Sequence, residues 1–165
     1  MSLLYPVLGL VLAERCGELA LAARNTRRLR ALGAVEADRE GYPLFVLLHG
    51  AWLLSLALTV PAKAPASWPL LAVFALLQGA RLWVIRTLGR FWTTRVITLP
   101  GAPLVRRGPF RYVRHPNYLV VTAEIAILPL AFGAVALALI FSALNMALLA
   151  RRIRIEQRAL AGRPG

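Results

Sequence analysis

Long apolar stretches alternate with short polar ones along the 165-residue chain. A membrane-spanning helix needs about 20 mostly apolar residues, and several stretches approach or meet this length. Charged residues gather between these stretches. The pattern therefore predicts an all-α integral membrane protein with about five transmembrane helices in a single domain, residues 1–165. The expected spans are residues 3–23, 42–60, 70–88, 118–132 and 134–150.

The composition supports the membrane class, since 59% of the residues are hydrophobic and 16% are charged. A soluble domain is about half apolar and about a quarter charged. One cysteine, Cys16, cannot form a disulfide framework or a cysteine metal cluster within the chain. Two distant histidines and loops without an acidic cluster predict no metal site. The N-terminus lacks a basic region, so we expect no cleaved signal peptide.

The net charge of +13 first suggests nucleic-acid binding. However, the arginines border apolar runs, which is typical of loops that stay in the cytoplasm. The turn at residues 61–69 carries only Lys63, and the last hairpin turn is uncharged. We therefore expect no nucleic acid, attraction to anionic membrane lipids, an external N-terminus and a cytoplasmic C-terminus. All basic residues except Lys63 are arginine, which favours a GC-rich bacterial gene and the bacterial inner membrane.

The first span contains charges that are expensive in lipid. Arg15 and Glu18 are three residues apart, which predicts an intrahelical pair turned into the helix bundle, with a substrate contact as the alternative. Residues 24–30 (RNTRRLR) then read as a basic loop. His49 in the second span is interpreted as an interhelical contact, with catalysis as the alternative. Arg81 in the third span lies near the basic end, so it can snorkel to the interface; it is also retained as a catalytic candidate.

Residues 89–114 are too polar and too broken to cross a membrane. We divide the chain into N-terminal spans at about 3–88 and, at 89–165, a cytoplasmic cofactor-binding segment, a helical hairpin and a tail. Residues 90–99 read either as a short extended segment or as an interfacial turn. The last span continues as a helical extension beyond the membrane, since nothing breaks it before Gly162.

The densest polar chemistry lies at residues 108–124, GPFRYVRHPNYLVVTAE. Proline suits the first turn of a helix, and free amides at a helix N-terminus beside arginines form an anion site. Glu124 lies about two turns deeper, and a carboxylate buried in a span is a functional candidate by default. The candidates around the helix start are Arg111, Arg114, His115, Pro116, Asn117 and Tyr118.

The tail carries an arginine stripe and an expected Arg152–Glu156 ion pair, although a membrane-facing basic helix explains this spacing equally well. An anion site, carboxylates and an aromatic ring at a membrane surface suit S-adenosyl-L-methionine. A phospholipid headgroup or a nucleotide fits the composition as well.

The run GPFRYVRHPNY, a glutamate in the next helix and RIRIEQ near the end resemble the isoprenylcysteine carboxyl methyltransferase family over about residues 81–160. The closest resemblance is to bacterial members associated with type III polyketide synthases, which O-methylate alkylpyrone-type lipids. Two departures from the family pattern are Val120, where glycine is common, and Glu156–Gln157 in place of an acidic pair. The RHPNY run is shared with membrane sterol reductases.

The resemblance implies an integral-membrane methyltransferase that uses S-adenosyl-L-methionine. It implies that His115, Tyr118 and Glu156 contact the cofactor, and that Arg114 and Arg154 lie near its carboxylate. Glu124 would sit where cofactor and acceptor meet, which makes it the second catalytic candidate beside Arg81. No Rossmann glycine pattern is present.

We therefore expect an O-methyltransferase whose lipophilic small-molecule acceptor enters from the bilayer. A phospholipid N-methyltransferase, an NADPH-dependent reductase and a non-enzymatic membrane subunit remain alternatives. A carboxylate or acidic enol acceptor needs no base, whereas a phenol or amine requires proton removal by His115 or Glu124. The sequence carries no signal of oligomeric state.

Overall fold

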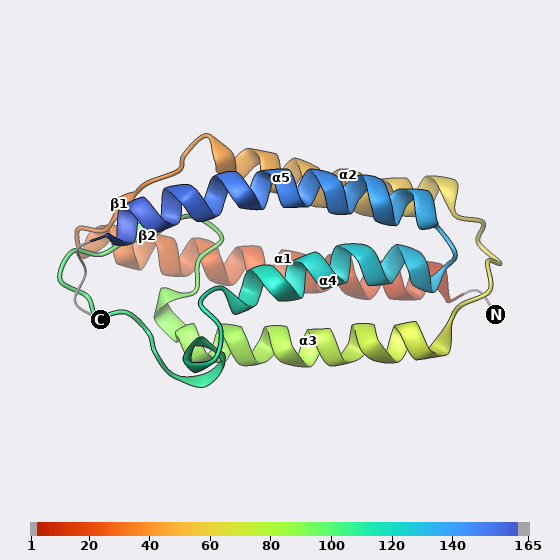
Figure 1. The fold of residues 1–165 in the computed structure, drawn as a ribbon, viewed down its shortest axis with the longest axis horizontal. Coiled ribbons are helices and arrows are strands. Elements are labelled where there is room, and N and C mark those ends of the chain that lie inside the picture. Colours follow the sequence, from red (N-terminus) through yellow and green to blue (C-terminus); the bar gives the residue numbers. More distant parts are fainter. Residues whose placement is uncertain (1–2, 162–165) are drawn as a thin grey trace.

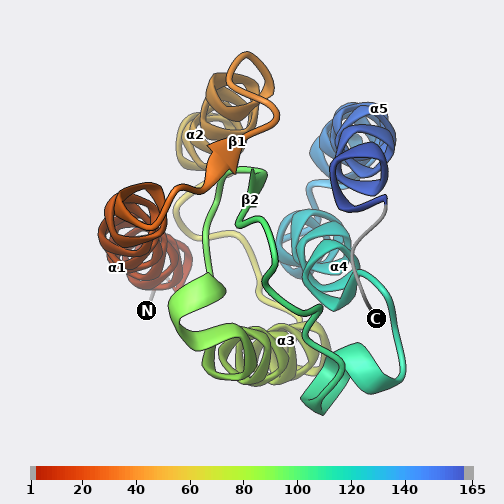
Figure 2. The ribbon, with the colours of Figure 1, turned by 90° about the vertical axis from the view of Figure 1, so that its left-hand side faces the viewer.

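Five helices run side by side along the long axis of the molecule in the computed structural model, which describes residues 3–161 (Figure 1). Consecutive helices alternate in direction, so α1 begins and α5 ends at opposite ends of the bundle. Viewed end-on, the order around the bundle is α1, α2, α5, α4 and α3 (Figure 2). The helices are α1 Leu4–Ala31, α2 Gly41–Thr59, α3 Trp68–Leu88, α4 Pro116–Ala131 and α5 Val135–Leu160.

The helices confirm an all-α membrane protein. Three of them, at Gly41–Thr59, Trp68–Phe91 and Val135–Ala159, are long and apolar enough to cross a bilayer. Helix α4 is apolar but has only 16 residues, and α1 carries charged residues in its middle. Large apolar side chains such as Leu58 and Leu76 are 74% exposed on the outside of the bundle, as expected of lipid-facing positions.

The apolar core lies toward the end of the bundle opposite the basic loops. Leu4, Leu56 and Leu128 are completely buried there, on α1, α2 and α4 respectively. A tight turn at Gly133, with a φ of +72°, joins α4 to α5 and confirms the expected helical hairpin. This packing leaves the other half of the bundle, near the basic loops, for polar groups.

The basic end contains short elements that hold the loops together. Strand β1 (Val35–Glu36) pairs antiparallel with β2 (Ile97–Thr98), and 3-10 turns occupy Gly89–Phe91 (η1) and Gly108–Arg111 (η2). The segment at 90–99 thus contains both alternatives, a turn followed by an extended piece. The Glu36 carboxylate accepts a hydrogen bond from Arg95 Nη1 at 2.7 Å and another from Arg30. Together with the strand pair, these contacts hold the 89–115 segment against the α1–α2 connection.

Helix α1 is longer than the sequence pattern predicted. The basic run at residues 24–30, expected as a loop, forms its last two turns. Arginine favours helices, no glycine or proline lies between Gly17 and Gly33, and cations are stabilising near a helix C-terminus. At the other end of the chain, α5 continues past the membrane segment as expected and ends at Leu160. Gly162, the expected breaker, lies outside the described residues.

Asn25 ties this end of α1 to the turn after α3. Its side chain is 4% exposed, and Nδ2 donates to the carbonyl oxygens of Gly89 at 3.1 Å and Trp92 at 2.8 Å. We expect Asn25→Ala to lower the free energy of unfolding by about 1–3 kcal/mol, because the carbonyls of Gly89 and of the buried Trp92 lose their donor. Thermal unfolding in detergent measures the loss. Arg24→Ala, an exposed change in the same turn, should stay within about 0.5 kcal/mol, and equal effects of the two would contradict the role of Asn25.

Candidate active site

Two adjoining cavities occupy the basic half of the bundle. The larger, of about 260 Å³, lies among the helices and is lined by residues of all five. The smaller, of about 170 Å³, lies between the 88–98 segment, the start of α4 and the end of α5. They share a wall, so a molecule in one cavity borders a molecule in the other. The shared wall consists of Trp92, Thr93, Asn117, Tyr118 and Arg152.

Three residues that the family resemblance implied as cofactor contacts meet at the smaller cavity. The Tyr118 hydroxyl donates to Glu156 Oε2 at 2.5 Å, and His115 Nδ1 lies 3.7 Å from the same oxygen. The His115 and Tyr118 rings stack with centroids 5.3 Å apart. Helix α4 begins here and α5 ends here, which brings residues 38 positions apart into contact.

Arg152 is a central residue of the site, and the sequence predicted the wrong partner for it. Its expected ion pair with Glu156 is replaced by a shared partner, because Arg152 Nε donates to the Tyr118 hydroxyl at 3.0 Å. Its Nη2 donates to the Thr94 carbonyl at 2.8 Å, and its guanidinium lies 5.0 Å from the Phe45 ring centroid. The i,i+4 spacing was the available signal, but it does not reveal that both side chains face α4.

The helix start offers fewer free amides than expected. The amides of Tyr118 and Leu119 both donate to the His115 carbonyl, at 3.1 and 3.4 Å, because His115 caps the helix. The polar atoms left over are side-chain atoms instead. His115 Nε2, Asn117 Oδ1 and Trp92 Nε1 are buried and have no hydrogen-bond partner among the described residues. Buried polar groups are almost always bonded, so these atoms fit a polar ligand in the cavities.

The predicted arginines differ in their placement. Arg114 lines the smaller cavity, as does Arg95, which the sequence reading did not single out. Arg111 and Arg154 are exposed and line neither cavity of the described structure. Arg154 Nε donates to the Ala150 carbonyl of its own helix at 3.1 Å. Neither Arg111 nor Arg154 contacts a cavity, so their roles at the cofactor stay predictions.

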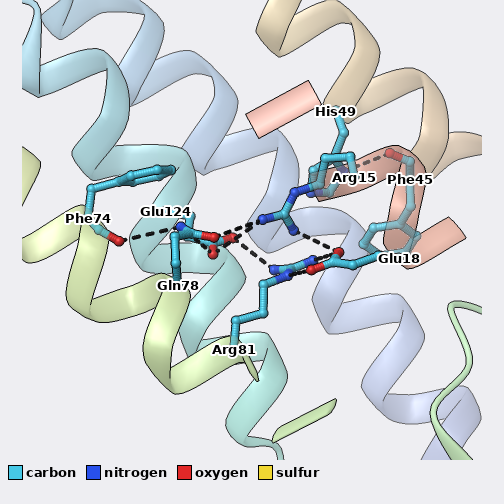
Figure 3. A network of polar contacts seen from close by, with 8 residues as sticks. All are labelled: Arg15, Glu18, Phe45, His49, Phe74, Gln78, Arg81 and Glu124. Atoms are coloured by element: carbon cyan, nitrogen blue, oxygen red, sulfur yellow. Dashed lines mark hydrogen bonds and ion pairs between the residues drawn. The ribbon is translucent and has the colours of Figure 1, made fainter. Parts of the chain in front are cut away.

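A network of buried charges crosses three helices beside the larger cavity (Figure 3). Arg81 Nη1 donates to Glu124 Oε2 at 2.8 Å and Nη2 donates to Glu18 Oε2 at 2.7 Å. Arg15 bonds Glu18 at 3.1 Å, which confirms the predicted intrahelical pair, and reaches Glu124 at 3.5 Å. Gln78 Nε2 also donates to Glu124, at 3.0 Å. Two guanidinium groups thus face two carboxylates.

This network corrects one interpretation of Arg81. The side chain is 7% exposed and bonds two carboxylates inside the bundle, so it does not snorkel to the interface. Arg81, Arg15 and Glu18 line the larger cavity. Glu124, which is 3% exposed, does not line this cavity. It is connected to the cavity through its bonds to Arg81 and Arg15. A direct role of Glu124 at the reacting groups stays a prediction.

The remaining wall of the larger cavity comes mainly from α1 and α2. It is apolar, with Phe45, Val46 and Leu53 on one side, and it also includes the exposed Cys16. From Tyr42 to Leu53 the cavity follows α2 for roughly 16 Å at 1.5 Å per residue. This length and lining suit an alkyl tail. His49 lies on the same wall, and its ring bonds the Phe45 carbonyl of its own helix rather than another helix.

Residues 70–162 match the isoprenylcysteine carboxyl methyltransferase (ICMT) family. The chain belongs to this family. The matched range contains α4, α5 and every residue of the smaller cavity. Membership in the ICMT family implies a membrane methyltransferase. Helices α1 and α2, which supply much of the larger cavity, precede the matched range.

Two bacterial relatives align over nearly the whole chain. "Uncharacterized protein YpbQ" of Bacillus subtilis is 36% identical over 158 residues, which cover 93% of this chain and 94% of its own length. An "Uncharacterized protein" of Haemophilus influenzae is 29% identical over 157 residues, covering 92% and 91%. No solved structure matches the chain. These names carry no activity, so the association with type III polyketide synthases stays a prediction.

Proposed function

We propose that this ICMT-family protein moves a methyl group from S-adenosyl-L-methionine to an oxygen of a lipophilic small molecule. The observation that carries the proposal is the pair of cavities with different linings and a common wall. Methyl transfer is an in-line displacement that is accelerated chiefly by holding donor and acceptor close and aligned. Two compartments that share Asn117, Tyr118 and Arg152 provide that arrangement.

The smaller cavity suits the donor, which supplies an electrophilic methyl group on a sulfonium. Glu156 and the Tyr118 hydroxyl are placed to hold an ammonium or ribose hydroxyls, and Arg95 and Arg114 to hold a carboxylate. The unpartnered His115 Nε2 and Asn117 Oδ1 provide further polar contacts. An aromatic face such as that of Tyr118 stabilises a cation.

The larger cavity suits an acceptor with an apolar tail, such as an alkylpyrone-type lipid. Phe45, Val46 and Leu53 of α2 make one wall apolar, whereas the Arg15–Glu18–Arg81 face is polar. An amphipathic molecule fits with its tail along α2 and its reacting oxygen near the shared wall. We place the basic end in the cytoplasm of a bacterial inner membrane, because basic loops stay on that side and the donor is a soluble cytoplasmic metabolite.

Methyl transfer can be tested directly. The full-length protein in nanodiscs is incubated with methyl-tritiated S-adenosyl-L-methionine and a bacterial lipid extract, and the organic phase is counted and fractionated. We expect a labelled lipid of low polarity, with equal labelling by an Arg24→Ala control. Alkali releases label from a methyl ester but not from an ether. Label on an amine headgroup, or lipid reduction that depends on NADPH, would contradict O-methylation.

A further inference from the structure

The larger cavity opens sideways between α1 and α2. Most of the residues that line it are buried or half-buried in the bundle. Leu12 on α1 and Val46 on α2 also line it, yet they are 55% and 42% exposed on the outside of the bundle. Residues that face both a cavity and the surrounding lipid mark an opening. Among the described lining residues, the exposed ones are Leu12, Cys16, Val46 and Gly50, and we call these residues the window.

The window is apolar and about one helical turn long. It takes two residues from each helix, four positions apart, which corresponds to about 6 Å along the helix axis. The two helices are neighbours and run in opposite directions, as Figure 1 and Figure 2 show. A free cysteine behaves as a small hydrophobe, and a Cβ at Gly50 would meet no atom within 4 Å. The window therefore offers an alkyl chain an apolar border and open space.

The apolar core closes the deep end of the cavity. Leu53 is the last residue of α2 that lines it. About one turn further, Leu56 is completely buried in the core together with Leu4 of α1. The Tyr5 hydroxyl donates to the Ala57 carbonyl at 3.5 Å, which joins α1 to α2 beyond the cavity. An alkyl chain inside the cavity therefore cannot continue along α2 into the far half of the bundle.

The volume of the cavity sets a second limit on what it holds. An engineered cavity of about 150 Å³ binds one benzene molecule. At about 260 Å³, the larger cavity has room for a reacting head group and the first carbons of a tail, but not for a long alkyl chain as well. The rest of such a chain has to lie outside the bundle.

The window lies next to the wall that the two cavities share. The Arg152 guanidinium, which belongs to this wall, lies 5.0 Å from the Phe45 ring centroid. Phe45 directly precedes the window residue Val46, and Gly50 follows Phe45 by roughly 8 Å along α2. A tail that begins at the shared wall therefore meets the window before it meets the closed end at Leu53.

We propose that the tail of the acceptor leaves the bundle through the window, so that the reacting end is held at the shared wall while the rest of the tail stays in the bilayer. This inference rests on the proposed function. It makes Gly50 a specificity-determining residue, because the missing side chain keeps the window open. It also means that the protein does not select acceptors by tail length. An enclosed tunnel would select strongly, since one methylene too many in an apolar pocket costs about tenfold or more.

Gly50→Leu narrows the window by a change that the helix accepts. Leucine favours helices more than glycine does, and the space around a Cβ at Gly50 is open. Gly79→Leu is the matched control, because Gly79 lies inside α3, is exposed and has the same open space around its Cβ. It lines neither cavity of the described structure. Circular dichroism of both variants in nanodiscs checks that they fold alike.

Photolabelling tests the window without donor or turnover. The probes are 3-pentadecylphenol and hexadecanoic acid, each carrying a diazirine either at mid-chain or at the chain end. With at least one head group, we expect the mid-chain probe to label the peptides that contain the window residues, and excess unlabelled compound to compete this labelling away. Gly50→Leu should lower it about tenfold, and Gly79→Leu should leave it unchanged. Mass spectrometry identifies the labelled peptides.

The probes with a diazirine at the chain end show where the tail goes. We expect them to label nanodisc lipid and no lining residue of the larger cavity. Competable labelling of Leu53 by these probes would mean an enclosed tail and would overturn the proposal. So would the absence of competable labelling at the window, or equal labelling in Gly50→Leu and Gly79→Leu.

Tail length provides a second arm in the tritium assay, with dodecyl, octadecyl and propyl chains on both a phenol and a carboxylic acid. For the head group that is methylated, we expect kcat/KM to differ by less than about twofold between dodecyl and octadecyl, because the added carbons stay in lipid and gain no burial from water. Gly50→Leu should lower kcat/KM about tenfold for octadecyl and leave the propyl compound unchanged. A steep length dependence in the unaltered protein, or an equal loss for long and short tails, would contradict the window.

The two proposals fail in different ways. Methylation together with an enclosed tail would overturn the window while leaving methyl transfer intact. Failure of the unaltered protein to bind S-adenosyl-L-methionine, measured by equilibrium dialysis, would contradict the proposed function. The photolabelling arm requires neither the donor nor turnover, so it still decides whether the window holds an alkyl tail.

Discussion

Glu124→Leu is expected to destabilise the protein by about 3–5 kcal/mol, the usual cost of removing one partner from a buried ion pair. Glu124 is 3% exposed and accepts hydrogen bonds from Arg81, Arg15 and Gln78. Its removal leaves Arg15 and Arg81 in the bundle with Glu18 as the one carboxylate that both of them bond among the described residues. Reversible unfolding in detergent micelles, followed by circular dichroism, measures the change.

A matched substitution on the same helix separates charge from packing. Leu119→Ala lies on the lipid-facing side of α4, 60% exposed, and should cost less than about 1 kcal/mol. A double variant, Arg81→Met with Glu124→Leu, should lose less stability than the sum of the two single changes. Each single change leaves the other residue of the pair buried without its partner, whereas the double change does not. Strict additivity would show that the two side chains do not act as a pair.

Glu156→Gln and Tyr118→Phe are expected to weaken S-adenosyl-L-methionine binding by about 10- to 100-fold. Each change removes a charge-assisted hydrogen bond at the smaller cavity, worth about 1.5–3 kcal/mol, and 1.4 kcal/mol corresponds to tenfold in affinity. Tyr118→Phe keeps the ring that stacks on His115 but loses the hydroxyl bonded by Glu156 and Arg152. Isothermal titration calorimetry on the purified protein gives the affinities.

The control for donor binding lies on the same helix. Arg158→Ala changes an exposed arginine of α5 that lines neither cavity, and its affinity should stay within about twofold of the unaltered protein. Unchanged binding in both Glu156→Gln and Tyr118→Phe would remove the smaller cavity as the donor site.

The sequence predicts the helices well because lipid imposes long apolar runs. The expected spans 42–60, 70–88 and 118–132 match α2 to α4 within a few residues, and α5 begins one residue after the start of its expected span and continues past it as the expected extension. The end of α1 was predicted wrongly, because a hydropathy pattern assigns clustered arginines to a loop. A local signal, the absence of glycine or proline between Gly17 and Gly33, was the better guide.

The site was harder to predict because its contacts are distant in the chain. Arg15 and Glu18 are visible as an i,i+3 pair, but Arg15 meets Glu124 across 109 positions. No spacing rule connects residues on different helices. Similarly, Arg152 reaches the Thr94 carbonyl across 58 positions. The RHPNY run marked the smaller cavity, whereas nothing comparable marked the larger one.

The position of Cys16 has a practical consequence. It is the one cysteine of the chain, it is exposed, and it borders the larger cavity. A fluorophore or spin label can therefore be attached at this wall without first removing other thiols. The rate at which a membrane-permeant maleimide reacts there, with and without a long-chain ligand, reports directly how often the α1 side of the bundle admits molecules from the surrounding lipid.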